Sequence, residues 1–158
     1  MAREPSIRDG ILNVLLVDDD SDHRWLTRDA IGLTDRPCCI HEAASAEEAL
    51  AMLTGAEGRC ERLNPDVIYL DVEMPGMGGL ILLSRIKSDP RLRGIMVVMV
   101  TGSRETSRQQ QEAIRNGADG FIRKTKNTSE MMQALRAPVE QYSMWAVGAD
   151  SREAKTTR

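Results

Sequence analysis

Apolar and polar residues follow two alternating patterns along the chain. Short runs of almost continuous apolar residues predict buried strands at residues 11–17, 38–43, 66–71, 95–100 and 120–124. Between these runs, apolar residues recur at helical spacing, which predicts amphipathic helices. Strands that alternate with helices form parallel sheets covered on both faces. We therefore expect a doubly wound α/β domain with five parallel strands and five helices.

Polar segments mark the expected limits of this domain. Residues 1–10 are polar and predict a flexible lead-in. Residues 11–147 are expected to form a single domain with an extended C-terminal helix, kinked or broken at Pro138. The polar segment 148–158 is expected to be a disordered tail.

The composition excludes several classes of protein. The 158 residues, 41% hydrophobic and 28% charged, suit one globular domain. A net charge of −3 and few aromatic residues argue against nucleic-acid binding. His23, His41 and the cysteines Cys38, Cys39 and Cys60 have neither the spacing of a zinc site nor the density of a disulfide framework. Without a long apolar run or a signal peptide, we expect a cytoplasmic protein that does not contact the membrane.

Polar side chains lie at or just beyond the carboxyl ends of four of the five predicted strands. They are Asp18, Asp19, Asp20, Asp71, Thr101 and Lys124. The carboxyl ends of parallel strands meet at one edge of the sheet, so we expect these side chains to converge there. Crowded carboxylates repel one another unless a proton or cation is bound, and oxygen ligands favour Mg²⁺.

A metal held by carboxylates beside an ammonium and a hydroxyl is suited to a phosphoryl group. Asp71 stands alone at the end of a central strand, which favours it as the nucleophile. The cluster at residues 18–20 is better suited to holding the metal.

Four motifs resemble the response-regulator receiver domain of two-component signalling. They are Val14–Asp19, Tyr69–Gly79, Val100–Gly102 and Gly120–Lys124, within a match over residues 11–137. The resemblance implies a flavodoxin-like fold with Asp71 as the phosphoacceptor. It also implies that Asp19 binds Mg²⁺ directly, that Asp18 is the second acidic ligand, and that Glu73 contributes its backbone carbonyl.

The same resemblance implies roles for three further residues. Thr101 and Lys124 would contact the phosphoryl oxygens, and Phe121 would occupy the aromatic switch position. Phosphorylation would then change the face made by the fourth helix, the fifth strand and the fifth helix. The protein would be a switch rather than a turnover enzyme, and its phosphodonor would be a sensor histidine kinase.

The sequence departs from the family pattern at several positions. Thr125 replaces the usual proline after Lys124, and Gly78 replaces an aspartate that caps the following helix. Gly102 stands where alanine is common, and Asp20 could share the role of Asp19.

A weaker resemblance is to the stand-alone receivers that partner phytochrome histidine kinases. It rests on residues 55–64 and 86–90, the Lys124–Thr125 pair and the long C-terminal helix near Tyr142 and Trp145. It implies a light-sensing kinase partner and a homodimer. Alternatively, the two aromatic residues cover an edge of their own domain.

Two other functions remain open from the sequence. An aspartate-nucleophile phosphatase would use Asp71 as nucleophile and Glu73 as acid, although such enzymes carry the nucleophile on their first strand. A pseudo-receiver would bind a partner without phosphorylation. As a switch, the protein would act through a downstream target, a phosphotransfer protein or its own dimerisation.

Overall fold

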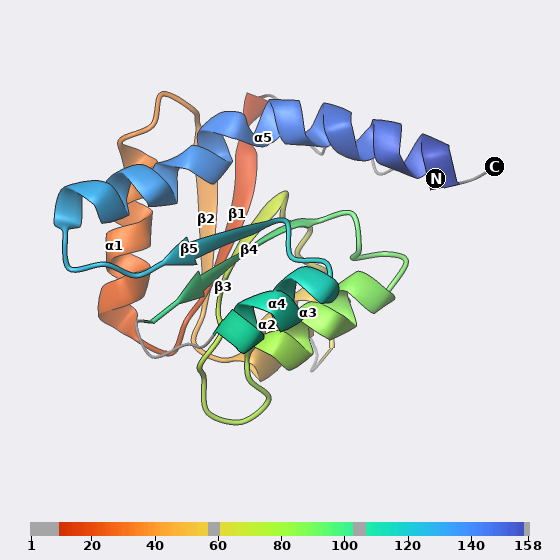
Figure 1. The fold of residues 1–158 in the computed structure, drawn as a ribbon, viewed down its shortest axis with the longest axis horizontal. Coiled ribbons are helices and arrows are strands. Elements are labelled where there is room, and N and C mark those ends of the chain that lie inside the picture. The colour runs from red at the N-terminus through yellow and green to blue at the C-terminus, as the bar shows by residue number, and fades with distance from the viewer. Residues whose placement is uncertain (1–9, 57–60, 103–106, 157–158) are drawn as a thin grey trace.

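The computed structural model describes residues 10–56, 61–102 and 107–156. The order of elements alternates strand and helix, as the sequence predicts, and Figure 1 shows them. The strands are β1 (Leu12–Val17), β2 (Cys38–Ala43), β3 (Val67–Asp71), β4 (Met96–Thr101) and β5 (Gly120–Arg123). The helices are α1 (Ser21–Gly32), α2 (Ala46–Thr54), α3 (Gly79–Ser88), α4 (Ser107–Arg115) and α5 (Thr128–Thr156).

The strands form one parallel sheet in the order β2-β1-β3-β4-β5. The chain moves outward from β1 to β2, returns to place β3 on the other side of β1, and continues outward to β5. The switch point of a doubly wound sheet therefore lies between β1 and β3. The predicted fold class is confirmed.

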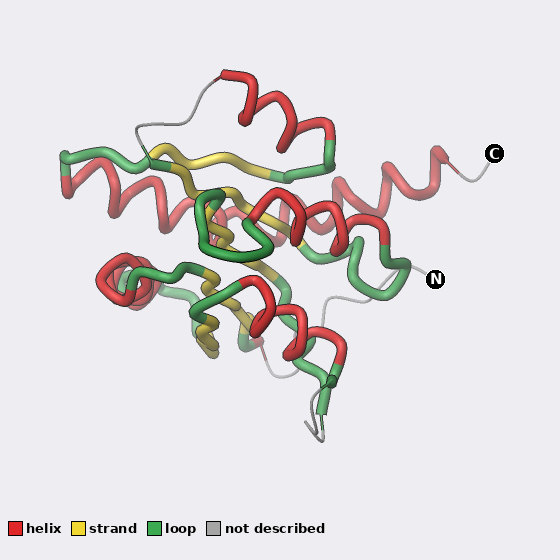
Figure 2. The backbone as a smooth tube through the Cα atoms, turned by 90° about the horizontal axis from the view of Figure 1, so that it is seen from below, coloured by secondary structure: helices red, strands yellow, loops and turns green. Residues whose placement is uncertain are grey.

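The two faces of the sheet carry separate apolar cores. On one face α1 and α5 pack together, and α5 contributes Met131, Leu135 and Val139 to the core. On the other face lie α2, α3 and α4, as Figures 1 and 2 show. β3 is buried along its whole length because it lies between both layers and between two other strands.

Helix α5 runs further than expected and is bent rather than broken. It continues through Pro138 and ends at Thr156, so the expectation of a disordered tail is wrong for residues 148–156. A proline inside a helix removes one backbone hydrogen bond and bends the helix. Both views show that α5 changes direction along its length.

Tyr142 covers an edge of its own domain. Its side chain is buried in the core beneath α5, and its hydroxyl lies 3.4 Å from the Asp66 carboxylate at the start of β3. The Arg36 guanidinium lies 5.6 Å from the centre of the Tyr142 ring. These contacts support the alternative that Tyr142 covers an edge of its own domain. The side chains of Trp145 and Cys60 lie outside the part of the chain that the structure describes.

Among the described residues, no helix combines the length and apolar character needed to cross a membrane.

Candidate functional site

Three carboxylates meet at the switch point. Asp18 and Asp19 follow β1, and Asp71 ends β3, which is the neighbouring strand. One oxygen from each lies within 4.8 Å of the others, which is close enough to surround one cation. The oxygen-only donor set fits Mg²⁺.

Two of these carboxylates are buried and the third faces solvent. Asp18 and Asp71 are 7% and 6% exposed, whereas Asp19 is exposed. Burial, together with the nearby Asp18 charge, raises the pKa of Asp71 to about 7. The Lys124 ammonium and the backbone N–H of Glu73 oppose this shift by favouring the charged form. A cation would relieve the same repulsion, so the site fits a bound metal.

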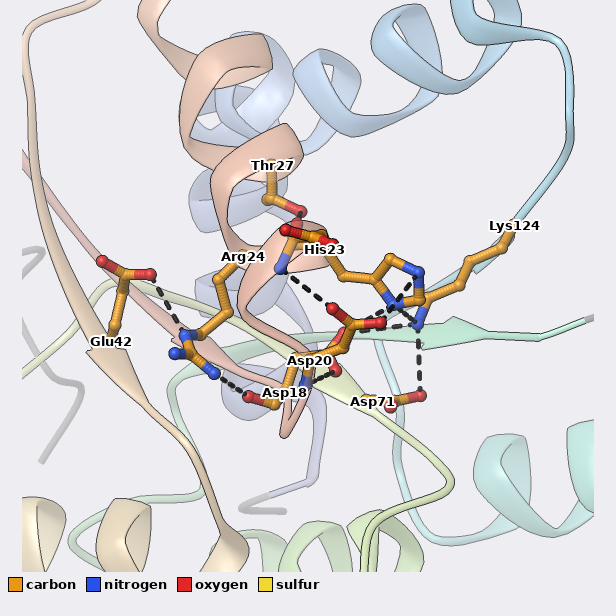
Figure 3. A network of polar contacts seen from close by, with 9 residues as sticks. Asp18, Asp20, His23, Arg24, Thr27, Glu42, Asp71 and Lys124 are labelled. Carbon is orange, nitrogen blue, oxygen red and sulfur yellow. Dashed lines mark hydrogen bonds and ion pairs between the residues drawn. The ribbon is translucent and has the colours of Figure 1, made fainter.

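Lys124 enters the site from β5. Its Nζ lies 3.2 Å from Asp18 Oδ2 and 3.7 Å from Asp71 Oδ1. Figure 3 draws these contacts as dashed lines. The backbone N–H of Lys124 donates to the Thr101 carbonyl, which ties the end of β5 to β4. Thr125 replaces proline without a cis peptide bond, and its hydroxyl accepts from the Asn127 N–H at 2.9 Å. Asn127 then caps α5 by accepting from the Glu130 N–H.

Thr101 ends β4 and is fully buried. Its Oγ1 has no hydrogen-bond partner among the described residues, a set that omits residues 103–106. A buried hydroxyl without a partner is unfavourable, so this hydroxyl retains unused hydrogen-bonding capacity. Phe121 is half-buried against the core beneath α4, and Gly102 adds no side chain beside Thr101.

Asp20 does not join the carboxylate cluster. It is the N-cap of α1, where its Oδ1 accepts from the Asp22 N–H at 2.9 Å. This hydrogen bond lowers the pKa of Asp20 and commits the carboxylate to the helix. The described carboxylates that could surround a cation are therefore those of Asp18, Asp19 and Asp71, so Asp20 does not share the role expected of Asp19.

The turn between β3 and α3 is held by a residue from another helix. Gly78, the N-cap of α3, provides no side-chain hydrogen bond. Instead, Glu47 of α2 accepts from the Met77 N–H at 2.8 Å. Gly79 packs against the backbone of Asp71, where a Cβ would collide with the carbonyl oxygen. The turn that contains Glu73 is thus positioned by α2 and by a close backbone contact.

His23 is a polar member of the site that the sequence analysis did not identify. It lies in the first turn of α1, and its Nδ1 is 2.7 Å from Lys124 Nζ. Its two ring nitrogens also face Asp18 and Asp20, each at 3.5 Å (Figure 3). The sequence places His23 three residues after Asp20, in the first turn of the helix that follows the acidic cluster, and this position could have indicated its place in the site. The spacing of zinc ligands, by which the histidines were judged, does not detect such a role.

A small cavity opens beside these residues. Its volume is about 90 Å³, and its polar lining includes Asp18, His23, Asp71 and Lys124. Its apolar lining includes Leu26, Val100 and Met131. The cavity gives small groups access to the Asp71 carboxylate.

Comparisons with known proteins agree with this arrangement. Residues 14–136 match the response regulator receiver domain family. Over 122 residues the chain is 30% identical to the nitrate/nitrite response regulator protein NarL of Escherichia coli (strain K12). That alignment covers 77% of this chain and 52% of NarL, so the chain spans about half the length of this relative.

Two solved structures have the same fold. The phosphorylated cyanobacterial phytochrome response regulator RcpA is 26% identical, with a TM-score of 0.77 over 83% of this chain and 93% of that one. The Mn²⁺-bound response regulator Rcp1 is 20% identical, with a TM-score of 0.74 over 80% of this chain and 91% of that one. The chain belongs to the response regulator receiver domain family.

Proposed function

We propose that this protein accepts a phosphoryl group on Asp71 from a histidine kinase in the presence of Mg²⁺. The observation that carries the proposal is the convergence of Asp71 with two further carboxylates and the Lys124 ammonium. The unpartnered Thr101 hydroxyl at the end of the neighbouring strand supports it. Family membership supports the same function. A receiver domain acts as a phosphoacceptor rather than as a turnover enzyme.

Each residue has a defined task in this transfer. Asp18, Asp19 and Asp71 would hold the metal through their carboxylates, and Glu73 through its backbone carbonyl. When bound, Mg²⁺ would neutralise charge on the phosphoryl oxygens. An Asp71 oxygen forms the new O–P bond as the N–P bond to the kinase histidine breaks, and the imidazole keeps that electron pair.

The remaining residues respond to the added charge. Phosphorylation adds about two negative charges beside Lys124 and Thr101. Lys124 would pair with one phosphoryl oxygen, and the Thr101 hydroxyl would donate to another. Movement of Thr101 would leave space for Phe121 to turn inward, which would change the face formed by α4, β5 and α5.

The family and the structural neighbours support a proposal for the partners of this protein. We propose a sensor histidine kinase as phosphodonor, and the likeness to RcpA favours a phytochrome. The output would pass to a downstream protein or phosphotransfer protein, or through a homodimer. Residues 11–147 would form the receiver unit, acting in the cytoplasm.

The test is phosphorylation of the purified protein by acetyl phosphate and Mg²⁺, followed by intact mass measurement. One added phosphoryl group is expected in the wild type and none in Asp71→Asn. Undiminished labelling of Asp71→Asn would refute the assignment of Asp71. Absence of labelling in the wild type would favour a pseudo-receiver, and sustained phosphate release from small phosphate esters would favour a phosphatase.

A further inference from the structure

His23 makes polar contacts that the proposed phosphotransfer does not account for. Its imidazole lies between the Lys124 ammonium, the Asp18 carboxylate and the Asp20 carboxylate. We propose that His23 is a positioning residue, whose Nδ1 holds the Lys124 ammonium beside Asp71 and offers it an acceptor other than Asp18.

The donor and acceptor roles in this contact follow from elementary chemistry. An ammonium group has three N–H donors and no acceptor. At 2.7 Å from Lys124 Nζ, the His23 Nδ1 must therefore accept the hydrogen bond. The ring proton then resides on Nε2, which faces Asp20 Oδ2 at 3.5 Å. Asp20, already fixed as the N-cap of α1, thus places a carboxylate oxygen near this ring N–H.

The His23 side chain contributes little to the packing of α1 against the core. Its side chain is 44% exposed, whereas the residues that α1 buries are Thr27, Ala30 and Ile31. Substitution of His23 should therefore leave the core intact. Its effects should be confined to the polar site.

The contact matters because both oxygens of Asp18 are already engaged. Oδ1 accepts from the Asp20 N–H at 2.9 Å, and Oδ2 faces Lys124 Nζ at 3.2 Å. A cation bound by Asp18 would repel the neighbouring ammonium and favour its release from Oδ2. His23 retains a hydrogen bond to the ammonium during that release, which lowers the cost of separating Lys124 from Asp18.

This consequence rests on the proposed metal-dependent function, whereas the hydrogen bond itself does not. The first experiment is therefore carried out without metal or phosphodonor. The chain has two histidines, and ¹⁵N NMR spectra distinguish an imidazole nitrogen that accepts a hydrogen bond from one that carries a proton. His41, on β2 beside Cys39, is the internal control.

At mildly alkaline pH, the His23 Nδ1 signal should be that of an acceptor. It should shift towards that of a free acceptor in Lys124→Met, while the His41 signals stay unchanged. A His23 ring protonated on both nitrogens, or an Nδ1 signal insensitive to Lys124→Met, would overturn the inference.

The second experiment measures Mg²⁺ affinity by calorimetry. His23→Leu should weaken Mg²⁺ binding by roughly tenfold, a loss typical of removing an outer partner of a metal site. His23→Asn should recover most of the affinity because its amide oxygen can replace Nδ1 as acceptor. His41→Leu is the matched control and should bind Mg²⁺ like the wild type.

Equal Mg²⁺ affinities of His23→Leu and His23→Asn would refute the positioning role. The experiments also distinguish failure of the His23 role from failure of the proposed phosphorylation of Asp71. If Asp71 is phosphorylated but the NMR result is negative, only the role of His23 is lost. If the NMR result is positive and Asp71 is never phosphorylated, the contact remains and the proposed function is lost.

Discussion

Lys124 Nζ lies 3.7 Å from Asp71 Oδ1, although β4 separates the strands that carry the two residues. Adjacent strands are about 4.8 Å apart, so a long side chain is needed to reach across the carboxyl end of β4. Thr101 ends β4 at the same edge of the sheet. One sheet edge thus brings together an ammonium, a hydroxyl and a carboxylate from three successive strands.

The raised pKa of Asp71 predicts a pH-dependent effect of Asp71→Asn on stability. A pKa raised to about 7 in the folded protein means that protonation of Asp71 favours folding. This contribution is full below the ordinary pKa of 3.8 and is lost as the pH rises through about 7. Asparagine stays uncharged at every pH, so the Asp71→Asn variant does not lose stability in this way as the pH rises.

We therefore expect Asp71→Asn to raise the free energy of unfolding at pH above 7 by about 1–2 kcal/mol, after allowance for solvent screening. The difference should shrink towards acidic pH. Urea denaturation in the presence of a chelator, at several pH values, measures it. Asp89→Asn is the control, because the half-buried Asp89 has a pKa lowered by its hydrogen bonds with Arg91 and should not show this gain. A pH-independent difference would contradict the explanation.

The unpartnered hydroxyl of Thr101 predicts opposite effects for two substitutions. Thr101→Val replaces a buried, unpaired hydroxyl with a methyl group and should raise the free energy of unfolding by about 1 kcal/mol. Thr101→Ser keeps the hydroxyl but leaves a small cavity, and should lower it by about 1 kcal/mol. Urea denaturation of the unphosphorylated protein separates the two. A destabilised Thr101→Val variant would mean that the hydroxyl is paired.

The contact between Glu47 and Met77 predicts a local effect on the turn that follows Asp71. Glu47→Ala removes the acceptor of the Met77 N–H, so hydrogen exchange at that amide should become faster. Glu47→Gln keeps an acceptor oxygen and should restore most of the protection. If both variants exchange like the wild type, α2 does not hold this turn.

Lys87 should stabilise the amino end of the sheet. Its Nζ donates to Asp119 Oδ2 at 2.8 Å and to the Ile95 carbonyl at 2.7 Å, and both charged side chains are largely buried. Lys87→Met would leave the Asp119 carboxylate without its ammonium, at a cost of about 2–3 kcal/mol in the free energy of unfolding. Thermal and urea denaturation measure this loss.

The matched control is Arg91→Met, which removes the other lysine- or arginine-carboxylate pair near α3. Arg91 contacts Asp89 at 3.1 Å, but the Arg91 side chain is exposed. Its removal should change stability much less, because exposed pairs are screened by solvent. Similar losses for Lys87→Met and Arg91→Met would contradict the importance of burial.

Much of the site could be predicted because it follows from the ends of strands. The apolar run before Asp18 and the run before Asp71 each mark a strand, and parallel strands place their carboxyl ends together. The cap of α2 is local in the same way, because the Ser45 hydroxyl accepts from the N–H of Glu48, three residues later in the chain. Such patterns are local in the chain.

Side chains that meet from different elements were not predictable in the same way. Asp20 has the same chemistry as its neighbours, yet the backbone turns its carboxylate towards the Asp22 N–H. His23 approaches Lys124 only because α1 and the end of β5 border the same cavity. Glu47 reaches Met77 because α2 and α3 pack on one face of the sheet.

By itself the sequence determined the alternation of strands and helices, the parallel sheet and the residues at the strand ends, because apolar periodicity and burial are properties of consecutive positions. The tertiary structure alone decided which carboxylates share a cation site, which one caps a helix and which imidazole faces the lysine. Those outcomes depend on distances of a few ångströms between side chains far apart in the chain. Packing of the helices against the sheet sets these distances, and no local pattern encodes them.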